Sequence, residues 1–209
     1  MRKGTIRLAL LAIALCAVAA AADFTWDWRN QEAIGRTDQS LGNTSKLNET
    51  ERAALMDVIV ARLQKPLTER GYDNDRIREI ASTTRLRYVD VGEGKWAIMA
   101  TSLGLEGGCD ILANCPFWVF RLDYKGYVTM LEADAASYTV QPTATGGYAD
   151  LVLARHITPN ENRLTLYKYA EGKYADEGCY TATFSPAKEG DVKDPEIAPC
   201  KPEETKPVE

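Results

Sequence analysis

The run Pro116-Phe117-Trp118-Val119-Phe120 is apolar at every position. A strand with one face in solvent alternates apolar and polar side chains, whereas a strand covered on both faces reads as a continuous apolar run. The run therefore predicts a central strand of a sheet, with one of its two faces packed against helices.

Short apolar and aromatic segments with a period of two lie on both sides of this run, from residue 84 onwards. Glycine-bearing connections separate several of them, namely Gly92-Glu93-Gly94, Tyr124-Lys125-Gly126 and Glu171-Gly172. Such connections are typical of tight hairpins, in which the backbone needs a positive φ. Because hairpins join antiparallel strands, we expect antiparallel strands at 85–91, 95–102, 116–123, 127–133, 148–155, 163–169 and 173–184.

Two helices are predicted ahead of the sheet. Asn48 and Glu51 have the spacing of a capping box, and the apolar positions that follow at helical spacing are Leu55, Val58, Ile59 and Leu63. Pro66 is expected to end this helix. A second helix is expected to start at Asp73 or Asn74, with Ile77, Ile80 and Ala81 on one face. The fold class is therefore α+β, with N-terminal helices packed on an antiparallel β-meander sheet of about seven strands.

The chain divides into four parts. Residues 1–22 combine a positively charged start with an uncharged run from Leu8 to Ala22, which predicts a cleavable secretory signal peptide. An uncleaved membrane anchor is the alternative, which the shortness of the run disfavours. Residues 23–47 are expected to form an N-terminal arm, residues 48–184 the α+β domain, and residues 185–209 a tail rich in Pro, Glu and Lys that is largely disordered. We therefore expect an exported protein, periplasmic or secreted.

The N-terminal arm contains Trp26 and Trp28, separated by one residue. We predict that the arm docks on the domain through these tryptophans, as a half-buried strand. An exposed aromatic platform that binds sugar is the alternative.

Charge and cysteine content limit the partners. Removal of the three positive charges of residues 1–22 takes the formal net charge from −5 to −8. An acidic surface repels phosphate, so we expect neither nucleic acid nor, after cleavage, a membrane as partner.

The four cysteines beyond the signal peptide are expected to form the sequence-local disulfides Cys109–Cys115 and Cys179–Cys200 in an oxidising compartment. A zinc site is disfavoured because no pair has the spacing of zinc ligands.

Residues that could support catalysis do not form a recognised motif. The single histidine, His156, could pair with Asp150 or with a serine such as Ser137, but no nucleophile motif surrounds any of them. Asp90 starts a calcium-like loop whose alternate positions are glycines. The acidic residues that could form a pair for glycoside hydrolysis are Asp110, Asp123, Glu132, Asp134 and Asp150. We predict no metal ion, no cofactor and no enzymatic activity, with a secreted hydrolase that uses an acidic pair or His156 as an alternative.

The seven-residue ring closed by Cys109 and Cys115 is the most distinctive feature of the sequence. A small rigid loop loses little entropy when it binds, which is how many protein inhibitors enter an enzyme cleft. The alternative is a stapled connection between two strands with no partner. The glycine-rich stretch 104–108 is interpreted as a flexible approach to the ring. The candidate binding residues are Asp110, Ile111, Leu112, Asn114 and Trp118.

The stretch from Arg85 to Cys179 resembles a group of uncharacterised exported bacterial proteins. The motifs that carry the resemblance are Tyr88-x-Asp90, the two ring cysteines, Asn114-Cys115-Pro116-x-Trp118-Val119-Phe120-Arg121, Gly147-Tyr148-x-Asp150-Leu151, His156 and a later Tyr-x-x-Gly-x-Tyr hairpin. This resemblance implies export and fold. The chain is also similar to the periplasmic inhibitors of vertebrate lysozyme, which present a short disulfide ring ahead of a strand. Their ring carries a histidine, whereas residues 110–114 contain none.

These observations together predict an exported, non-enzymatic binding or envelope protein. Its partner is an unidentified protein or small ligand. A periplasmic inhibitor of a lytic enzyme is the alternative that the ring suggests.

Overall fold

The computed structural model describes residues 24–36, 39–185 and 193–201. The predicted signal peptide lies outside the described residues. The elements, in chain order, are the 3-10 helix η1 (Trp28–Asn30), β1 (Glu32–Ala33), α1 (Glu49–Glu69), α2 (Asn74–Ser82), β2 (Arg85–Asp90), β3 (Trp96–Thr101), β4 (Cys115–Asp123), β5 (Gly126–Ala135), β6 (Ser137–Thr145), β7 (Tyr148–Thr158), β8 (Glu161–Ala170), β9 (Lys173–Thr183) and β10 (Glu196–Pro199).

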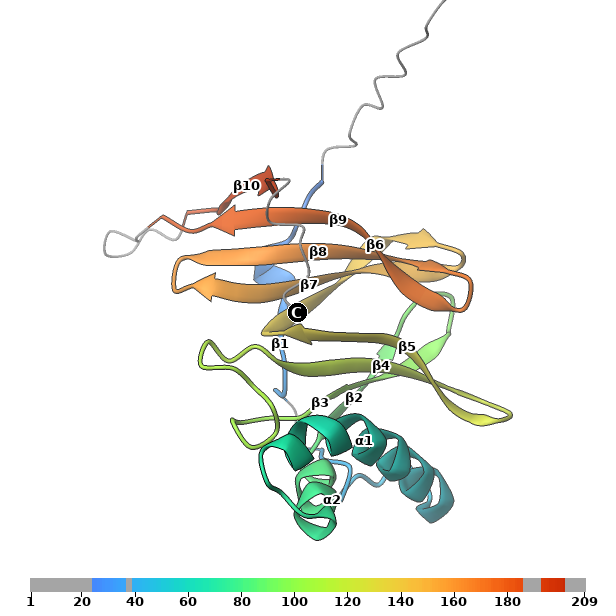
Figure 1. The fold of residues 1–209 in the computed structure, drawn as a ribbon. Coiled ribbons are helices and arrows are strands. Elements are labelled where there is room, and N and C mark those ends of the chain that lie inside the picture. Colours follow the sequence, from blue (N-terminus) through green and yellow to red (C-terminus); the bar gives the residue numbers. More distant parts are fainter. Residues whose placement is uncertain (1–23, 37–38, 186–192, 202–209) are drawn as a thin grey trace, which may run out of the picture.

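The elements form three layers (Figure 1). A six-stranded sheet with the order β1-β6-β7-β8-β9-β10 lies over a four-stranded sheet with the order β2-β3-β4-β5, and every pairing is antiparallel. The two helices cover the free side of the four-stranded sheet. The α+β class and the antiparallel pairing are therefore confirmed.

Strand β4 contributes to both hydrophobic cores. Trp118 and Phe120 pack with apolar residues of α1 and α2, such as Leu63. Phe117 and Val119 pack on the opposite side, among residues of the six-stranded sheet. The apolar run predicted as a central strand thus lies between β3 and β5, and both of its faces are covered.

The prediction of a single meander of about seven strands is wrong, because the strands divide into two sheets. The chain passes from one sheet to the other at Ala136, whose N–H donates to the Ala154 carbonyl oxygen (2.8 Å). Strand β6, which follows, was not predicted because Pro142 is unfavourable inside a strand. An irregularity in the register between Val140 and Ala144 accommodates the proline without breaking the sheet.

Helix α1 starts as predicted and ends later than predicted. The Asn48 side chain accepts a hydrogen bond from the Glu51 backbone N–H (2.9 Å), and the Glu51 carboxylate accepts one from the Asn48 N–H (3.0 Å), which completes the capping box. The helix continues through Pro66 to Glu69. Leu67 is 1% exposed in the core beneath α1, so its burial favours one further turn over an end at the proline.

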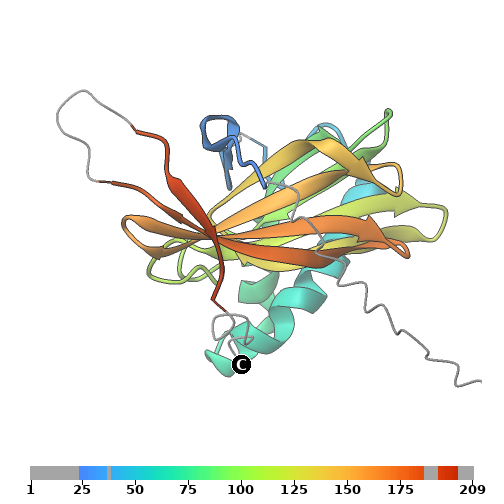
Figure 2. The same ribbon diagram turned by 90° about the horizontal axis from the view of Figure 1, so that it is seen from above.

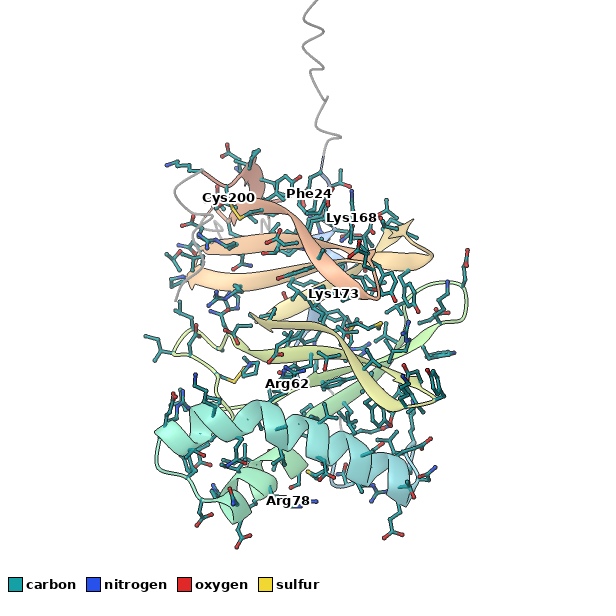
Figure 3. All side chains as sticks on the ribbon, turned by 45° about the vertical axis from the view of Figure 1, so that its right-hand side comes forward. Phe24, Arg62, Arg78, Lys168, Lys173 and Cys200 are labelled. Carbon is teal, nitrogen blue, oxygen red and sulfur yellow. A yellow bond between two sulfur atoms is a disulfide. The ribbon has the colours of Figure 1, made fainter. Side chains whose placement is uncertain are left out.

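A salt bridge links α1 to the sheet below it. Arg62 donates to the Glu132 carboxylate on β5 (2.8 Å), between the helix layer and the four-stranded sheet (Figure 3).

The predicted second helix is confirmed as α2, whose buried residues are Ile77, Ile80 and Ala81.

The N-terminal arm and part of the tail cover the outer side of the six-stranded sheet. Phe24 stacks on Tyr180 with ring centroids 3.9 Å apart, and Trp26 meets Phe184 edge to face. Trp28 forms η1, not a strand, and its indole N–H donates to Asp194 (2.8 Å). The arm therefore docks on the domain through its tryptophans, as predicted. The alternative of an exposed sugar-binding platform at Trp26 is wrong, because this side chain is buried.

The predicted tail contains an ordered strand. Residues 196–199 form β10, which pairs with β9, and the disulfide to Cys179 of β9 fixes Cys200, the residue directly after β10. Figure 2 shows this pair at the margin of the sheet, and Figure 3 shows Cys200 on the same outer side as Phe24. The Pro-rich composition of residues 185–209 indicates disorder, so β10 was not predicted. The strand forms despite its proline because it lies at the edge of the six-stranded sheet, where proline is tolerated.

We predict that Pro66→Ala stabilises the protein by about 1 to 2 kcal/mol, because proline is the least favourable residue in a helix and alanine the most favourable. Urea denaturation followed by circular dichroism measures the change. Lys65→Ala is the matched control on the same exposed turn, with an expected change within about 0.5 kcal/mol. A Pro66→Ala variant no more stable than the parent would contradict this account of the helix end.

Candidate binding surface around the disulfide ring

The loop between β3 and β4 carries the ring, defined as residues Cys109–Cys115. Both predicted disulfides are present, and the ring cysteines are 6% and 5% exposed. Two disulfides indicate an oxidising compartment outside the cytoplasm. The ring lies immediately before β4, so its base is attached to a strand that is buried on both faces.

The carboxylate of Asp110 organises the interior of the ring. Its Oδ1 accepts hydrogen bonds from the backbone N–H groups of Leu112 and Asn114 (both 2.9 Å), and its Oδ2 accepts one from Asn114 Nδ2 (2.8 Å). Burial by itself raises the pKa of Asp110, but the hydrogen bonds from Asn114 and Leu112 and the positive charge of Arg155 outweigh it, so the pKa lies below its usual value. Asp110 is therefore a structural anion that holds the ring closed.

Asn114 attaches the ring to the six-stranded sheet. Its Nδ2 donates to the His156 carbonyl oxygen (2.9 Å), and its Oδ1 accepts from the His156 backbone N–H (2.7 Å). This two-way pairing imitates the bonds between neighbouring strands, with a side chain in place of a backbone. Asn114 is 3% exposed, so it fixes the ring in place and is not available as the surface contact that we expected.

The other three predicted binding residues occupy different environments. Ile111 is 93% exposed and forms the tip of the ring, whereas Leu112 is half-buried. Trp118 is 2% exposed under the helices, so its expected place on the surface beside the ring is wrong. The apolar contact that the ring offers to a partner is therefore concentrated at Ile111.

An open groove of about 680 Å³ lies beside this tip. Leu105, which is 64% exposed, contributes an apolar side chain to the groove. The lining residues are Ile34, Leu103, Gly104, Leu105, Cys109, Asp110, Ile111, Ala113, Cys115, Ala136 and His156. Most of them lie between Leu103 and Cys115, whereas Ile34, Ala136 and His156 come from distant segments of the chain. Sequence reasoning missed Ile34 and Ala136 because no common motif links them to the ring.

Within the glycine-rich stretch, which we interpret as a flexible approach to the ring, Gly107 is packed closely against its neighbours, whereas a Cβ atom on Gly104 would meet nothing within 4 Å. A Cβ atom on Gly107 would lie 2.3 Å from the Leu103 carbonyl oxygen. The Cys109 N–H donates to the Gly104 carbonyl oxygen (3.0 Å), which closes the turn before the ring. Close approach of the backbone, not flexibility, therefore requires glycine at position 107.

Three of the residues considered for catalysis or for calcium have hydrogen-bond partners within the fold, although Asp150 Oδ1 is buried without a partner among the described residues. His156 Nδ1 lies 2.8 Å from Asn162 Oδ1, and Asp150 accepts a hydrogen bond from Thr143 (2.7 Å). Asp90 Oδ1 accepts from the Gly92 N–H (2.8 Å) in a hairpin turn. Across residues 24–36, 39–185 and 193–201 there is no group of three or more His, Cys, Asp or Glu side chains placed to hold a metal ion.

Comparison of the chain with protein-family models, with curated proteins and with solved structures gives no match. In the part of the chain that the structure describes, no helix is long and apolar enough to span a membrane.

We predict that the backbone amide proton resonances of Leu112 and Asn114 titrate together, with a midpoint below the 3.8 usual for an aspartate side chain. A carboxyl whose pKa is lowered by folding contributes stability that is complete above its unfolded pKa and is lost as the pH falls through its folded pKa. Two-dimensional NMR between pH 2 and 6 measures the midpoint. A midpoint at or above 3.8 would show that Asp110 does not hold the ring.

We predict that Asn114→Ala lowers the free energy of unfolding by about 2 to 3 kcal/mol, because it leaves buried backbone groups without partners. The same change raises the pKa of Asp110, which loses the hydrogen bond from the Asn114 side chain. Asn43→Ala is the control, since Asn43 is exposed and its side chain accepts a single hydrogen bond, from the Ser40 N–H. Equal losses from the two variants would refute the attachment of the ring through Asn114.

Proposed function

We propose that this protein is an exported protein-binding protein that inserts the tip of the Cys109–Cys115 ring into a partner. The observation that supports the proposal most directly is the 93% exposure of Ile111 on a loop fixed by a disulfide and by the side chains of Asp110 and Asn114. The proposal that the protein is exported is based on the signal-peptide pattern of residues 1–22 and on the two disulfides. It covers both a periplasmic and a secreted location.

Preorganisation is the physical reason for this assignment. An apolar side chain costs free energy when it is exposed to water, and burial in a partner's pocket recovers it. Because the ring is already fixed, binding requires little further ordering of its backbone. The groove beside Ile111 offers space for an apolar side chain of the partner in return.

The formal net charge, which is −5 for the full chain and −8 without residues 1–22, favours a basic partner, since opposite charges speed association. An inhibitor of a lytic enzyme is the specific form of the proposal that the geometry favours, because a convex, rigid tip fits a concave active site. The hydrolase alternative has less support, because the His156 ring is bonded to Asn162 and the Asp110 carboxylate is used within the ring.

Photo-crosslinking tests the proposal. We expect that p-benzoylphenylalanine in place of Ile111 gives a discrete crosslinked protein adduct in the exported fraction of the producing cell. The same substitution at Tyr124, which is 90% exposed at the other end of β4, is the control and should give no such adduct. No adduct at position 111, or the same adducts at both positions, would refute the ring as the binding surface.

Ile111→Ser tests the energetic part of the proposal once the adduct has identified the partner. We expect the Kd for that partner to rise at least about tenfold, while the free energy of unfolding changes by no more than about 0.5 kcal/mol, because the side chain is exposed. Calorimetric titration and urea denaturation measure the two quantities. A destabilised variant, or unchanged binding, would contradict the assignment of Ile111 as the contact.

A further inference from the structure

A small hollow of about 20 Å³ lies where the two sheets meet. Its wall includes Met99 of β3, Phe117 of β4 and Tyr138 of β6, and the rings of Phe117 and Tyr138 stack with centroids 5.4 Å apart. A cavity of this size holds about one water molecule. The hollow therefore has room for one polar atom of a ligand, and not for a whole organic molecule.

Three arginines line the same hollow, in a chain whose formal net charge is −5. Arg85 and Arg87 lie two residues apart on β2, so their side chains share one face of the strand. The face with Leu86 packs in the core under the helices, so the two arginines lie on the opposite face. Arg36 follows β1 in a turn that its backbone N–H closes by donating to the Ala33 carbonyl oxygen (3.3 Å).

The three guanidinium groups differ in their partners. Arg87 donates to both carboxylate oxygens of Glu32 (2.6 and 2.8 Å), across the two sheets. Among the residues that the structure describes, the side chains of Arg36 and Arg85 form no hydrogen bond and no ion pair. Each of these two therefore brings a positive charge and free N–H donors to the hollow.

The Tyr138 hydroxyl is a further donor in the wall of the hollow. The residue is 4% exposed, and its hydroxyl oxygen is buried with no hydrogen-bond partner in the described part of the chain. Burial raises the pKa of Tyr138 to about 12, so the hydroxyl keeps its proton at neutral pH. A buried hydroxyl without an acceptor is rare in folded proteins, and a ligand atom in the hollow would supply the acceptor.

We propose that this hollow is a binding site for a small oxyanion, in which one oxygen accepts a hydrogen bond from the Tyr138 hydroxyl while Arg36 and Arg85 hold the others. The anionic group is a carboxylate or a phosphate, because the fork of N–H donors on a guanidinium group matches the oxygens of both. The site goes beyond the proposed function and is independent of it, because it uses no residue of the ring.

Charge and size favour a small anion over the other classes of ligand. Among the described residues that line the hollow, none is acidic. The net negative charge of the chain repels a long polyanion, whereas a small anion responds mainly to the nearby guanidinium groups. A cationic or apolar ligand would leave the donors of Arg85 and Tyr138 without an acceptor.

Calorimetric and NMR titration of the full exported chain tests the site, in a low-salt buffer free of phosphate. Inorganic phosphate and acetate are the probes, and they distinguish the two kinds of oxyanion. Chloride is the control anion. We expect phosphate, acetate or both to bind with a Kd of about 1 to 5 mM and to shift the Arg85 Nε–H resonance, whereas chloride at the same concentration should not.

Matched variants then separate this site from a general effect of charge. We expect Arg85→Gln to weaken binding at least about tenfold, because it removes a charged donor. Arg163→Gln is the control and should leave the Kd unchanged within about twofold, since it removes the same charge. Arg163 is also half-buried, but it lies on β8 outside the hollow.

Tyr138→Phe separates binding from folding. We expect it to weaken binding about fivefold or more, because the ligand loses a donor, without lowering the melting temperature, since the lost hydroxyl has no partner within the fold. Ile111→Ser should bind the oxyanion like the parent chain, so that failure of the ring and failure of this site are distinguishable.

Three outcomes would overturn the proposal. One is the absence of binding by both phosphate and acetate at about 50 mM, where a Kd in the millimolar range gives near saturation. Another is an equal Kd for the parent chain and Arg85→Gln, or an equal loss in Arg163→Gln. The third is a lower melting temperature of Tyr138→Phe with unchanged binding, which would give the hydroxyl a role in the fold alone.

Discussion

Strand β4 carries the contacts of both hydrophobic cores, because Trp118 and Phe120 face the helices while Phe117 and Val119 face the six-stranded sheet. Each of these side chains is 2% exposed or less. A strand fixed from both sides cannot shift its register by one residue without moving apolar side chains to the wrong core. The loops at its two ends, the ring on one side and the turn to β5 on the other, are therefore attached to an element whose register is fixed from both sides.

The two ends of β4 are built in different ways. At the ring, backbone N–H groups in a tight loop need acceptors, and the Asp110 carboxylate and the Asn114 amide supply them. At the other end, the turn to β5 is closed by Gly126, whose φ is positive and which therefore satisfies the turn geometry without a side chain. At both ends a large side chain lies in solvent, Ile111 in the ring and Tyr124 in the turn, but only the ring is also closed by a disulfide.

The features that the sequence predicted correctly are those governed by local chemistry. The capping box at Asn48, the glycine hairpins and the disulfide pairing each depend on residues close together in the chain. The division into two sheets depends on Ala136, where the hydrogen bonds reach to Ala154 and no local signal marks the change. The groove likewise brings together residues from Ile34 to His156, so no single window of sequence contains it.

The burial of Trp118 follows from the same apolar run that predicts strand β4. The apolar run from Pro116 to Phe120 predicts a strand buried on both faces, and that prediction alone excludes an exposed indole at position 118. Polar residues in a small ring obey a similar constraint, since a loop of this size has to satisfy its own backbone before it can offer side chains to a partner. Asp110 and Asn114 serve that need, and Ile111, which has no hydrogen bond to make, is the residue left for recognition. In short disulfide rings, the exposed apolar residue is therefore a better candidate contact than the charged residue next to it.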